Sequence, residues 1–260
     1  MGIIDAVVIT GAGKGIGRSI SLELGKQGIP VLCISKSNSS TDTACEIKKF
    51  GGIAESLVLN ISDYDHAEKV LSEWVQKTPY KKLGVVLAAG ILGPKGPFVN
   101  SSLSEWEECM KVNVLGNLAI LKGLLPKMLE VKFGRIIMFS GGGAAYSFPI
   151  FPAYSASKTA MVRITENINE DLKGKGDFAI VCLAPGAVET EMLKEVRLAG
   201  AEVKTVVEIS EPLTFVQEFI NAKSCSFSGS LVHVRDNWKD YLNSNKSLGE
   251  DTHWKLRRIE

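Results

Sequence analysis

The sequence has few of the residues that build disulfide frameworks or metal sites. Its 260 residues include only five cysteines and three histidines. The cysteines are odd in number, none belongs to a Cys-x-x-Cys pair, and several lie in apolar runs, so we expect reduced packing residues in a cytoplasmic protein. His66, His233 and His253 are widely separated in the chain. This spacing predicts no metal site.

The sequence also lacks a charge excess and long apolar runs. Thirty Lys and Arg residues against 29 Asp and Glu residues give a formal net charge of +1. Because the two signs are interspersed, composition predicts neither a nucleic-acid surface nor a membrane surface. The N-terminus has no charged-then-apolar leader, and no apolar run approaches the length of a membrane span. These absences favour a soluble protein with small-molecule partners.

Short apolar runs alternate with longer helical patterns along the chain. The expected strands are residues 3–10, 29–35, 54–61, 84–89, 135–140, 178–184 and 230–234. The expected helices are residues 18–27, 41–50, 63–77, 103–131 and 154–172, with a bend at or before Pro126 in the fourth. Continuous apolar strands separated by helices are typical of a parallel sheet covered on both faces. The sequence therefore predicts one α/β domain over residues 1–260, with a doubly wound sheet of about seven strands.

Two stretches of the sequence show no regular spacing of apolar residues. Residues 191–211 are rich in charge, and a polar tail runs from about residue 236 to residue 260. We expect both to be mobile or dependent on a partner for their structure.

A glycine cluster follows the first expected strand. Gly11, Lys14, Gly15, Ile16 and Gly17 stand between that strand and the first expected helix. Glycines here let the backbone approach a pyrophosphate, whose charge a helix N-terminus favours. A glycine cluster alone is often only a tight turn, but its place between strand and helix favours dinucleotide binding.

Tyr154 and Lys158 stand four residues apart at the opening of an expected helix, so they share one face of it. A neighbouring cation favours the phenolate and is expected to lower the pKa of the tyrosine from its usual value of about 10. Such a tyrosine suits general acid or base catalysis. Taken alone, the pair is more often a surface pair that covers one turn of a helix.

The glycine cluster and the Tyr154-x-x-x-Lys158 pair together resemble the short-chain dehydrogenase/reductase superfamily in its classical form. The resemblance covers residues 3 to about 235. It implies a Rossmann-like fold and a nicotinamide-dependent oxidoreductase acting on a carbonyl or alcohol. It also implies that Tyr154 is the acid/base, that Lys158 lowers its pKa and holds the nicotinamide ribose, and that Asn113 bends a helix and holds a proton-relaying water.

The resemblance leaves the fourth catalytic residue open. Ser140 ends the fifth expected strand, where the family places a serine that binds the substrate oxygen. The usual family spacing to the tyrosine is one residue shorter, and that position here is Gly141. We expect Ser140 to be this residue, with a one-residue insertion in the following loop, and Ser147 is the alternative.

The second expected strand ends in a segment that bears on cofactor choice. Ser35, Lys36 and Ser37 stand there, and no acidic residue accompanies them. An acid would favour NAD(H), whereas cations favour the 2′-phosphate of NADP(H). Lys36 and Lys14, with the serine hydroxyls, therefore predict NADP(H), with NAD(H) as the other possibility.

The family resemblance implies further cofactor contacts elsewhere in the chain. They are Asn60 and Ile61 near the adenine, Ala89 and Gly90 through their backbone, and Pro185, Gly186, Val188 and Thr190 near the nicotinamide. Leu87 and Ala88 stand where the family commonly has asparagines, so we expect less polar support for the central sheet.

The substrate is the least defined feature. Tyr146, Phe148, Ile150 and Phe151 are expected to line an apolar wall beside the tyrosine or to pack in the core, and residues 191–211 occupy the family's substrate loop. The glycine-rich segment 140–144 and the segment 231–238 are similar to bacterial family members associated with surface sugars, which makes a sugar or nucleotide-sugar a candidate. The family implies a homodimer or homotetramer, with Trp238 and Trp254 reaching a neighbouring subunit. The alternative function is a cofactor-binding protein with a regulatory or structural role.

Overall fold

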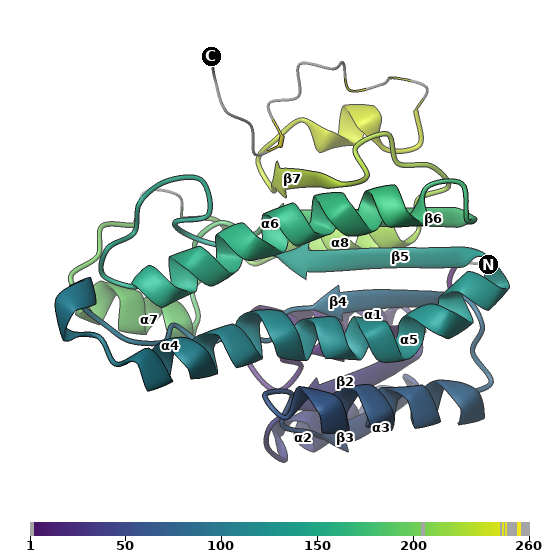
Figure 1. Ribbon diagram of the computed structural model, residues 1–260. Helices are drawn as coiled ribbons and strands as arrows, with labels where there is room; N and C mark the ends of the chain where they lie inside the picture. The colour runs from purple at the N-terminus through teal and green to yellow at the C-terminus, as the bar shows by residue number, and fades with distance from the viewer. Residues whose placement is uncertain (1–2, 204–205, 245, 247, 249–253, 256–260) are drawn as a thin grey trace.

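Seven parallel strands form one sheet in the part of the chain that the structure describes, which is residues 3–203, 206–244, 246, 248 and 254–255 of the computed structural model. The strand order is β3-β2-β1-β4-β5-β6-β7. The strands are β1 (Ala6–Thr10), β2 (Val31–Ser35), β3 (Ala54–Val58), β4 (Leu83–Leu87), β5 (Phe133–Phe139), β6 (Asp177–Ala184) and β7 (Ser230–His233). Figure 1 shows β3 and β7 at opposite edges. The predicted doubly wound parallel sheet is confirmed.

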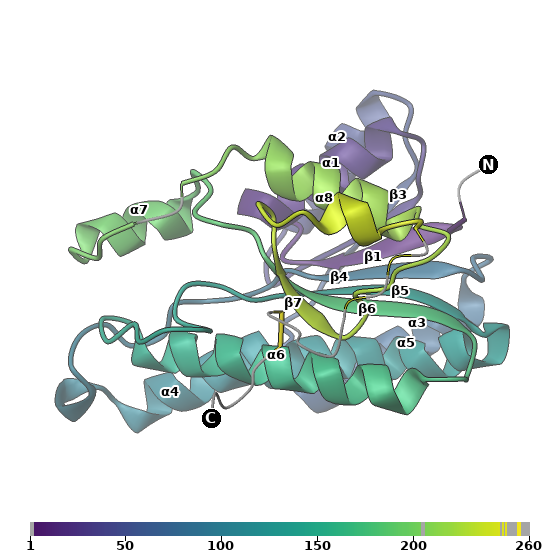
Figure 2. The ribbon, with the colours of Figure 1, turned by 90° about the horizontal axis from the view of Figure 1, so that it is seen from above.

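Helices cover both faces of this sheet. They are α1 (Gly15–Lys26), α2 (Ser39–Lys49), α3 (Tyr64–Lys77), α4 (Leu103–Met110), α5 (Asn117–Val131), α6 (Pro152–Leu172), α7 (Glu191–Leu198) and α8 (Ser210–Ile220). Seen from above, α1, α2 and α8 lie on one face and α3, α4, α5 and α6 on the other (Figure 2). The helices bury the apolar strand residues between them, which is why the strands read as continuous apolar runs.

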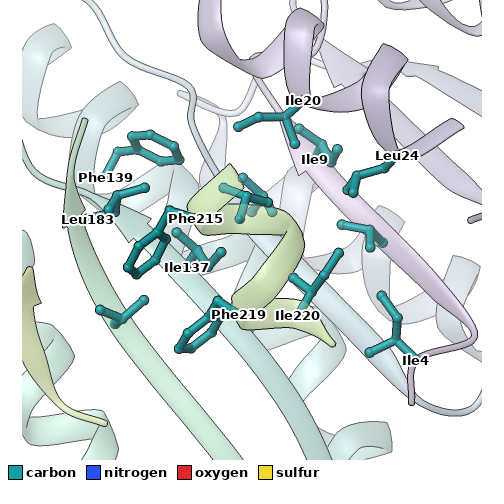
Figure 3. Packing of buried hydrophobic residues seen from close by; sticks show 14 of the residues in the cluster. Ile4, Ile9, Ile20, Leu24, Ile137, Phe139, Leu183, Phe215, Phe219 and Ile220 are labelled. Atoms are coloured by element: carbon teal, nitrogen blue, oxygen red, sulfur yellow. The ribbon is translucent and has the colours of Figure 1, made fainter. Parts of the chain in front are cut away.

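Each face of the sheet has its own apolar core. On the α1 and α8 face, Phe215 and Phe219 of α8 pack over Ile137 and Leu183 of the sheet (Figure 3). On the other face, Leu71 of α3 and Leu124 of α5 are fully buried against the strands. The two cores fix the sheet from both sides and hold the ends of the strands in place.

The helical run from Leu103 to Val131 contains a π-helical turn at Lys111–Gly116. Single π turns inside α-helices are frequent at functional sites. By length and hydropathy this 29-residue run is long enough to cross a membrane, contrary to the expectation from the sequence, but 56% of its most apolar window is buried. It packs between α3 and α6 and serves as a core helix.

The expectation of irregular structure over residues 191–211 is wrong at both ends of that stretch. Thr190 caps α7, because its hydroxyl accepts a hydrogen bond from the Leu193 amide at 3.3 Å. The helix α8 begins at Ser210 and buries Phe215, Val216, Phe219 and Ile220 on one face. This helical spacing is present in the sequence, and the preceding charged residues obscured it.

The expectation that Trp238 reaches a neighbouring subunit is also wrong, whereas the same expectation for Trp254 stays a prediction. Trp238 is 3% exposed, and its ring packs at 4.8 Å from that of Phe215, measured between centroids. The Trp254 ring contacts Phe227 and Tyr241. Both tryptophans therefore complete the apolar core of their own chain.

Candidate active site

The glycine turn after β1 brings backbone segments into very close contact. Gly11 and Gly15 have φ values of +68° and +55°, which L side chains rarely adopt. A Cβ on Gly17 would lie 2.5 Å from the Gly11 carbonyl oxygen, and a Cβ on Gly11 would lie 2.9 Å from the Ala89 nitrogen. The turn is thus closed to side chains, and the N-terminus of α1 is left open to an anion.

The predicted cofactor residues gather around this turn. Lys14 is exposed beside it, and Ile16 and Gly17 lie in the first turn of α1. The Thr190 methyl group lies 3.5 Å from the position of a Cβ on Gly15. The segment after β6 therefore lies next to the carboxyl end of β1. This segment contains Pro185, Gly186 and the buried Val188.

Three serine hydroxyls cluster where β2 ends. Ser35 Oγ donates to the Ser37 carbonyl at 2.7 Å and accepts from the Ser40 amide at 2.9 Å. Ser37 Oγ lies 3.0 Å from Ser39 Oγ. A Cβ on Gly13 would collide with Ser39 Oγ, so the serine cluster touches the glycine turn. Lys36 is exposed beside it, and Ser39 is a member that the sequence did not single out.

A buried polar clamp supports β4 where Leu87 and Ala88 replace the expected asparagines. Thr10 Oγ1 donates to Asn117 Oδ1 at 2.8 Å and accepts from the Ala89 amide at 3.0 Å. Asn117 Nδ2 in turn donates to the Ala89 carbonyl at 3.0 Å. Polar support is therefore supplied from β1 and α5. The sequence signal for Asn117 is its position one helical turn after Asn113.

Asn113 occupies the π turn and is completely buried. Its Oδ1 accepts from the Ile91 amide at 2.8 Å, and its Nδ2 donates to the Ile91 carbonyl and to Ser157 Oγ, both at 2.9 Å. Ser157 Oγ then donates to the Tyr154 carbonyl at 2.7 Å. Asn113 thereby ties the loop after β4 to the start of α6, and Ser157 is a further residue that the sequence did not indicate.

Tyr154 and Lys158 are brought together in the interior, with 8% and 4% of their surfaces exposed. The Lys158 ammonium lies 5.5 Å from the Tyr154 ring centroid and donates to the Phe139 carbonyl at 3.1 Å. Burial lowers the pKa of Lys158 to about 8. A Cβ on Gly90 would lie 3.6 Å from Lys158 Nζ, so the predicted Gly90 borders this pair.

The expected lowering of the tyrosine pKa is wrong for this site. Burial, followed by the nearby Cys109 and Tyr146, raises the pKa of Tyr154 well above its usual value. The reason is that removal from water disfavours the phenolate more than the neighbouring ammonium favours it. Tyr154 therefore holds its proton at neutral pH.

Ser140 and Gly141 lie differently with respect to Tyr154. The Ser140 amide donates to the Leu183 carbonyl at 2.8 Å, and its buried hydroxyl lies beside the Cys182 thiol. A Cβ on Gly141 would collide with the Tyr154 hydroxyl. Position 141 is thus the one that faces the phenol, and the role expected for Ser140 stays a prediction. Ser147 is exposed.

The remaining predicted adenine contacts lie beside β3. Asn60 is exposed, and its Oδ1 accepts from the Ser62 amide at 3.3 Å and from the Ser62 hydroxyl at 3.1 Å. Ile61 is buried, and its carbonyl oxygen approaches Gly116 so closely that a side chain there would collide with it. The Asn60 side chain therefore shapes a turn, and its contact with an adenine stays a prediction.

An apolar cluster surrounds the Tyr154 ring. Leu92, Phe151 and Tyr154 form its buried centre. Phe148, Ile150 and the α7 residues Met192, Val196 and Ala199 pack against that centre. Of the four residues expected to form an apolar wall, Phe148, Ile150 and Phe151 belong to this cluster, whereas Tyr146 is exposed and lies outside it.

The chain is similar in sequence and in fold to known proteins. The family model described as short chain dehydrogenase matches residues 5–200. Human 17-beta-hydroxysteroid dehydrogenase 13 is 32% identical over 260 residues, which cover 98% of this chain and 83% of the human protein. A short chain dehydrogenase of Pseudocercospora fijiensis is 31% identical over 188 residues, covering 71% of this chain and only 60% of the fungal protein. A Beutenbergia cavernae protein solved with bound NADP, and described as an NAD(P)-dependent gluconate 5-dehydrogenase, superposes with a TM-score of 0.79 at 27% identity, covering 90% and 96% of the two chains.

Proposed function

The chain belongs to the short-chain dehydrogenase family, and we propose that it is an NADP(H)-dependent oxidoreductase that reduces a carbonyl or oxidises the matching alcohol. The observation that carries this proposal is the buried Tyr154 and Lys158 pair beside Gly90. The pair and the glycine turn both lie at the carboxyl ends of the strands, where open α/β sheets bind their ligands. The homologous dehydrogenases agree with this assignment.

The residues present fit a nicotinamide dinucleotide. The glycine turn excludes side chains and exposes the N-terminus of α1 to a pyrophosphate. Ser37, Ser39 and Lys36 offer hydroxyl donors and a cation without a competing acid, which suits a 2′-phosphate. NADP bound to the Beutenbergia cavernae relative is consistent with this preference.

The proposed chemistry uses the protonated state of Tyr154. When bound, the nicotinamide supplies the hydride. In this reaction Tyr154 donates its proton to the carbonyl oxygen, and its raised pKa keeps that proton available at neutral pH. Lys158 stabilises the phenolate that results because its ammonium lies beside the ring. Asn113 and Ser157 hold the backbone of Tyr154 in position.

The walls around Tyr154 bear on the substrate. They are formed by Leu92, Phe148, Phe151 and the α7 residues Met192 and Val196. Apolar walls with few polar groups suit an apolar carbonyl compound. A keto-sugar stays the prediction of the sequence resemblance, and the gluconate enzyme among the relatives is consistent with it. Cytoplasmic location and a homodimeric or homotetrameric state stay predictions as well.

Fluorescence titration with NADPH and NADH in parallel, followed by a carbonyl panel containing aromatic ketones and keto-sugars, tests the proposal. Tyr154→Phe should retain NADPH binding and lose about 100- to 10,000-fold in turnover, because it removes the proton donor. A Tyr154→Phe variant with parental turnover would exclude the catalytic role. Binding of NADPH by a parent protein that reduces nothing in the panel would favour the regulatory alternative.

A further inference from the structure

The loop Gly141–Gly143 lacks side chains opposite the catalytic tyrosine. A Cβ on Gly141 would collide with the Tyr154 hydroxyl, and a Cβ on Gly143 would lie 2.5 Å from Ser155 Cβ. The loop is therefore pressed onto the start of α6, and its backbone passes directly beside the phenol. A serine side chain at position 141 has no room in this arrangement, so the second hydrogen-bond donor to a substrate oxygen must come from elsewhere.

Tyr146 lies beside the next glycine of this loop, Gly142. Its hydroxyl lies 3.6 Å from the position of a Cβ on Gly142, next to Gly141. The Tyr146 side chain is 63% exposed, and its hydroxyl makes no hydrogen bond to a residue that the structure describes. The Phe148 ring lies at 3.8 Å from the same point and limits the side from which Tyr146 can approach.

Electrostatic coupling between the two phenols agrees with this geometry. After burial and Cys109, Tyr146 is the third contribution that raises the pKa of Tyr154. Such an interaction weakens with distance, so the two phenols belong to the same site. The triple glycine allows this approach, because no side chain of residues 141–143 stands between the two hydroxyl groups.

We propose that Tyr146 donates the second hydrogen bond to the substrate oxygen, in the place of a side chain at position 141. This inference rests on the proposed carbonyl reduction. As hydride reaches the carbonyl carbon, the electron pair of the C=O π bond moves to the oxygen. Tyr154 transfers its proton to that oxygen, whereas Tyr146 keeps its own proton and stabilises the developing charge.

Two serines compete for this role, and no described hydrogen bond joins either of them to Tyr154. Ser140 ends β5 with its hydroxyl buried, and its neighbour Gly141 is the residue that faces the phenol. Ser147 is exposed and follows Tyr146 in the chain, but no described contact brings its hydroxyl to the glycine loop. Tyr146 is the donor whose hydroxyl lies beside that loop.

The test compares Tyr146→Phe with Tyr64→Phe, which removes the same hydroxyl from an exposed tyrosine on α3. With a carbonyl that the parent reduces, Tyr146→Phe should lower kcat by about 10- to 100-fold, while KM changes less than about threefold. Its dissociation constant for NADPH should equal that of the parent, and Tyr64→Phe should match the parent in all three quantities.

The outcomes separate this inference from the proposed function. Parental kcat in Tyr146→Phe, or an equal or larger loss in Ser147→Ala or Ser140→Ala, overturns the role of Tyr146 and leaves the proposed reduction intact. A loss confined to KM also overturns it, because it would indicate ground-state contact only. A parent that binds NADPH but reduces no carbonyl overturns both.

Discussion

The two ends of the site are built by different means. Around the glycine turn, other atoms lie so close that Gly11, Gly13 and Gly17 have no space for a Cβ. Gly11 and Gly17 contact backbone atoms, and Gly13 contacts the Ser39 side chain. Around Tyr154, function depends on buried polar side chains, with Asn113, Ser157 and Lys158 held by specific hydrogen bonds. The glycine turn has no room for an added side chain, whereas the surroundings of Tyr154 depend on keeping each hydrogen-bond partner. Substitutions should therefore fail in different ways at the two ends.

The largest effect is expected at Gly17. Gly17→Val places side-chain atoms against the Gly11 carbonyl, which forces the turn apart. NADPH binding should weaken by about 100-fold or more, measured by fluorescence titration. Gly28→Ala is the matched control at the other end of α1, where no atom lies within 4 Å. It should cost stability of about 1 kcal/mol because φ is positive, with binding unchanged. Tight NADPH binding by a folded Gly17→Val protein would refute the close-contact account.

The next effect separates the catalytic end from the cofactor end. Gly141→Ala pushes a methyl group against the Tyr154 hydroxyl and displaces the phenol. We expect kcat to fall by about 10-fold or more, with the NADPH dissociation constant unchanged. Gly142→Ala meets its nearest atoms at 3.6 Å and should lose far less. Equal losses in the two variants would show that loop flexibility, and not the phenol position, is the cause.

A smaller effect tests the source of cofactor preference. Lys36→Asp reverses the charge beside the Ser35 and Ser37 hydroxyl groups. NADPH binding should weaken by about 10-fold, whereas NADH binding should change by less than about threefold. Lys49→Asp makes the same charge change at the C-terminus of α2 and should affect neither cofactor. Parallel losses for NADPH and NADH would contradict a 2′-phosphate contact.

The smallest effect concerns stability at the catalytic end. Burial lowers the pKa of Lys158 from 10.5 to about 8, so the folded state binds fewer protons than the unfolded state between those values. This penalty is fully present below pH 8 and is relieved as the pH rises toward 10.5. Lys158→Met should raise the free energy of unfolding by about 1 to 2 kcal/mol at pH 7, with the gain vanishing above pH 10.5. Urea unfolding across this range measures it, and the exposed Lys175→Met should show no such pH dependence. A gain independent of pH would refute the ionisation account.

Most of the architecture was predictable because the strands and helices leave local patterns of apolar residues in the sequence. The apolar runs located all seven described strands to within a few residues, and the Tyr154-x-x-x-Lys158 spacing placed that pair on one helix face. Asn117 escaped notice because its partner Thr10 is 107 positions away. Contacts of this range depend on the sheet order, which a residue pattern does not specify.

The glycine loop shows the same limit at finer scale. The sequence favoured Ser140 with Ser147 as the alternative, because spacing alone does not say which side of the chain faces Tyr154. Similarly, the sequence did not identify Ser39 as a member of the serine cluster after β2, because its contact with Gly13 is visible only in the folded chain. The electrostatic state of Tyr154 was misjudged because burial, which a motif does not encode, outweighs the neighbouring lysine.

The contact between Trp254 and β7 has a consequence for self-association. As an edge strand of the sheet, β7 exposes backbone groups that could pair with a strand of another copy. The Leu231 amide instead donates to the Trp254 carbonyl at 2.7 Å, and the indole is held by Phe227 and Tyr241. The backbone amide of Leu231 on this edge strand is therefore already paired within the chain and is not free to bind a strand of another copy.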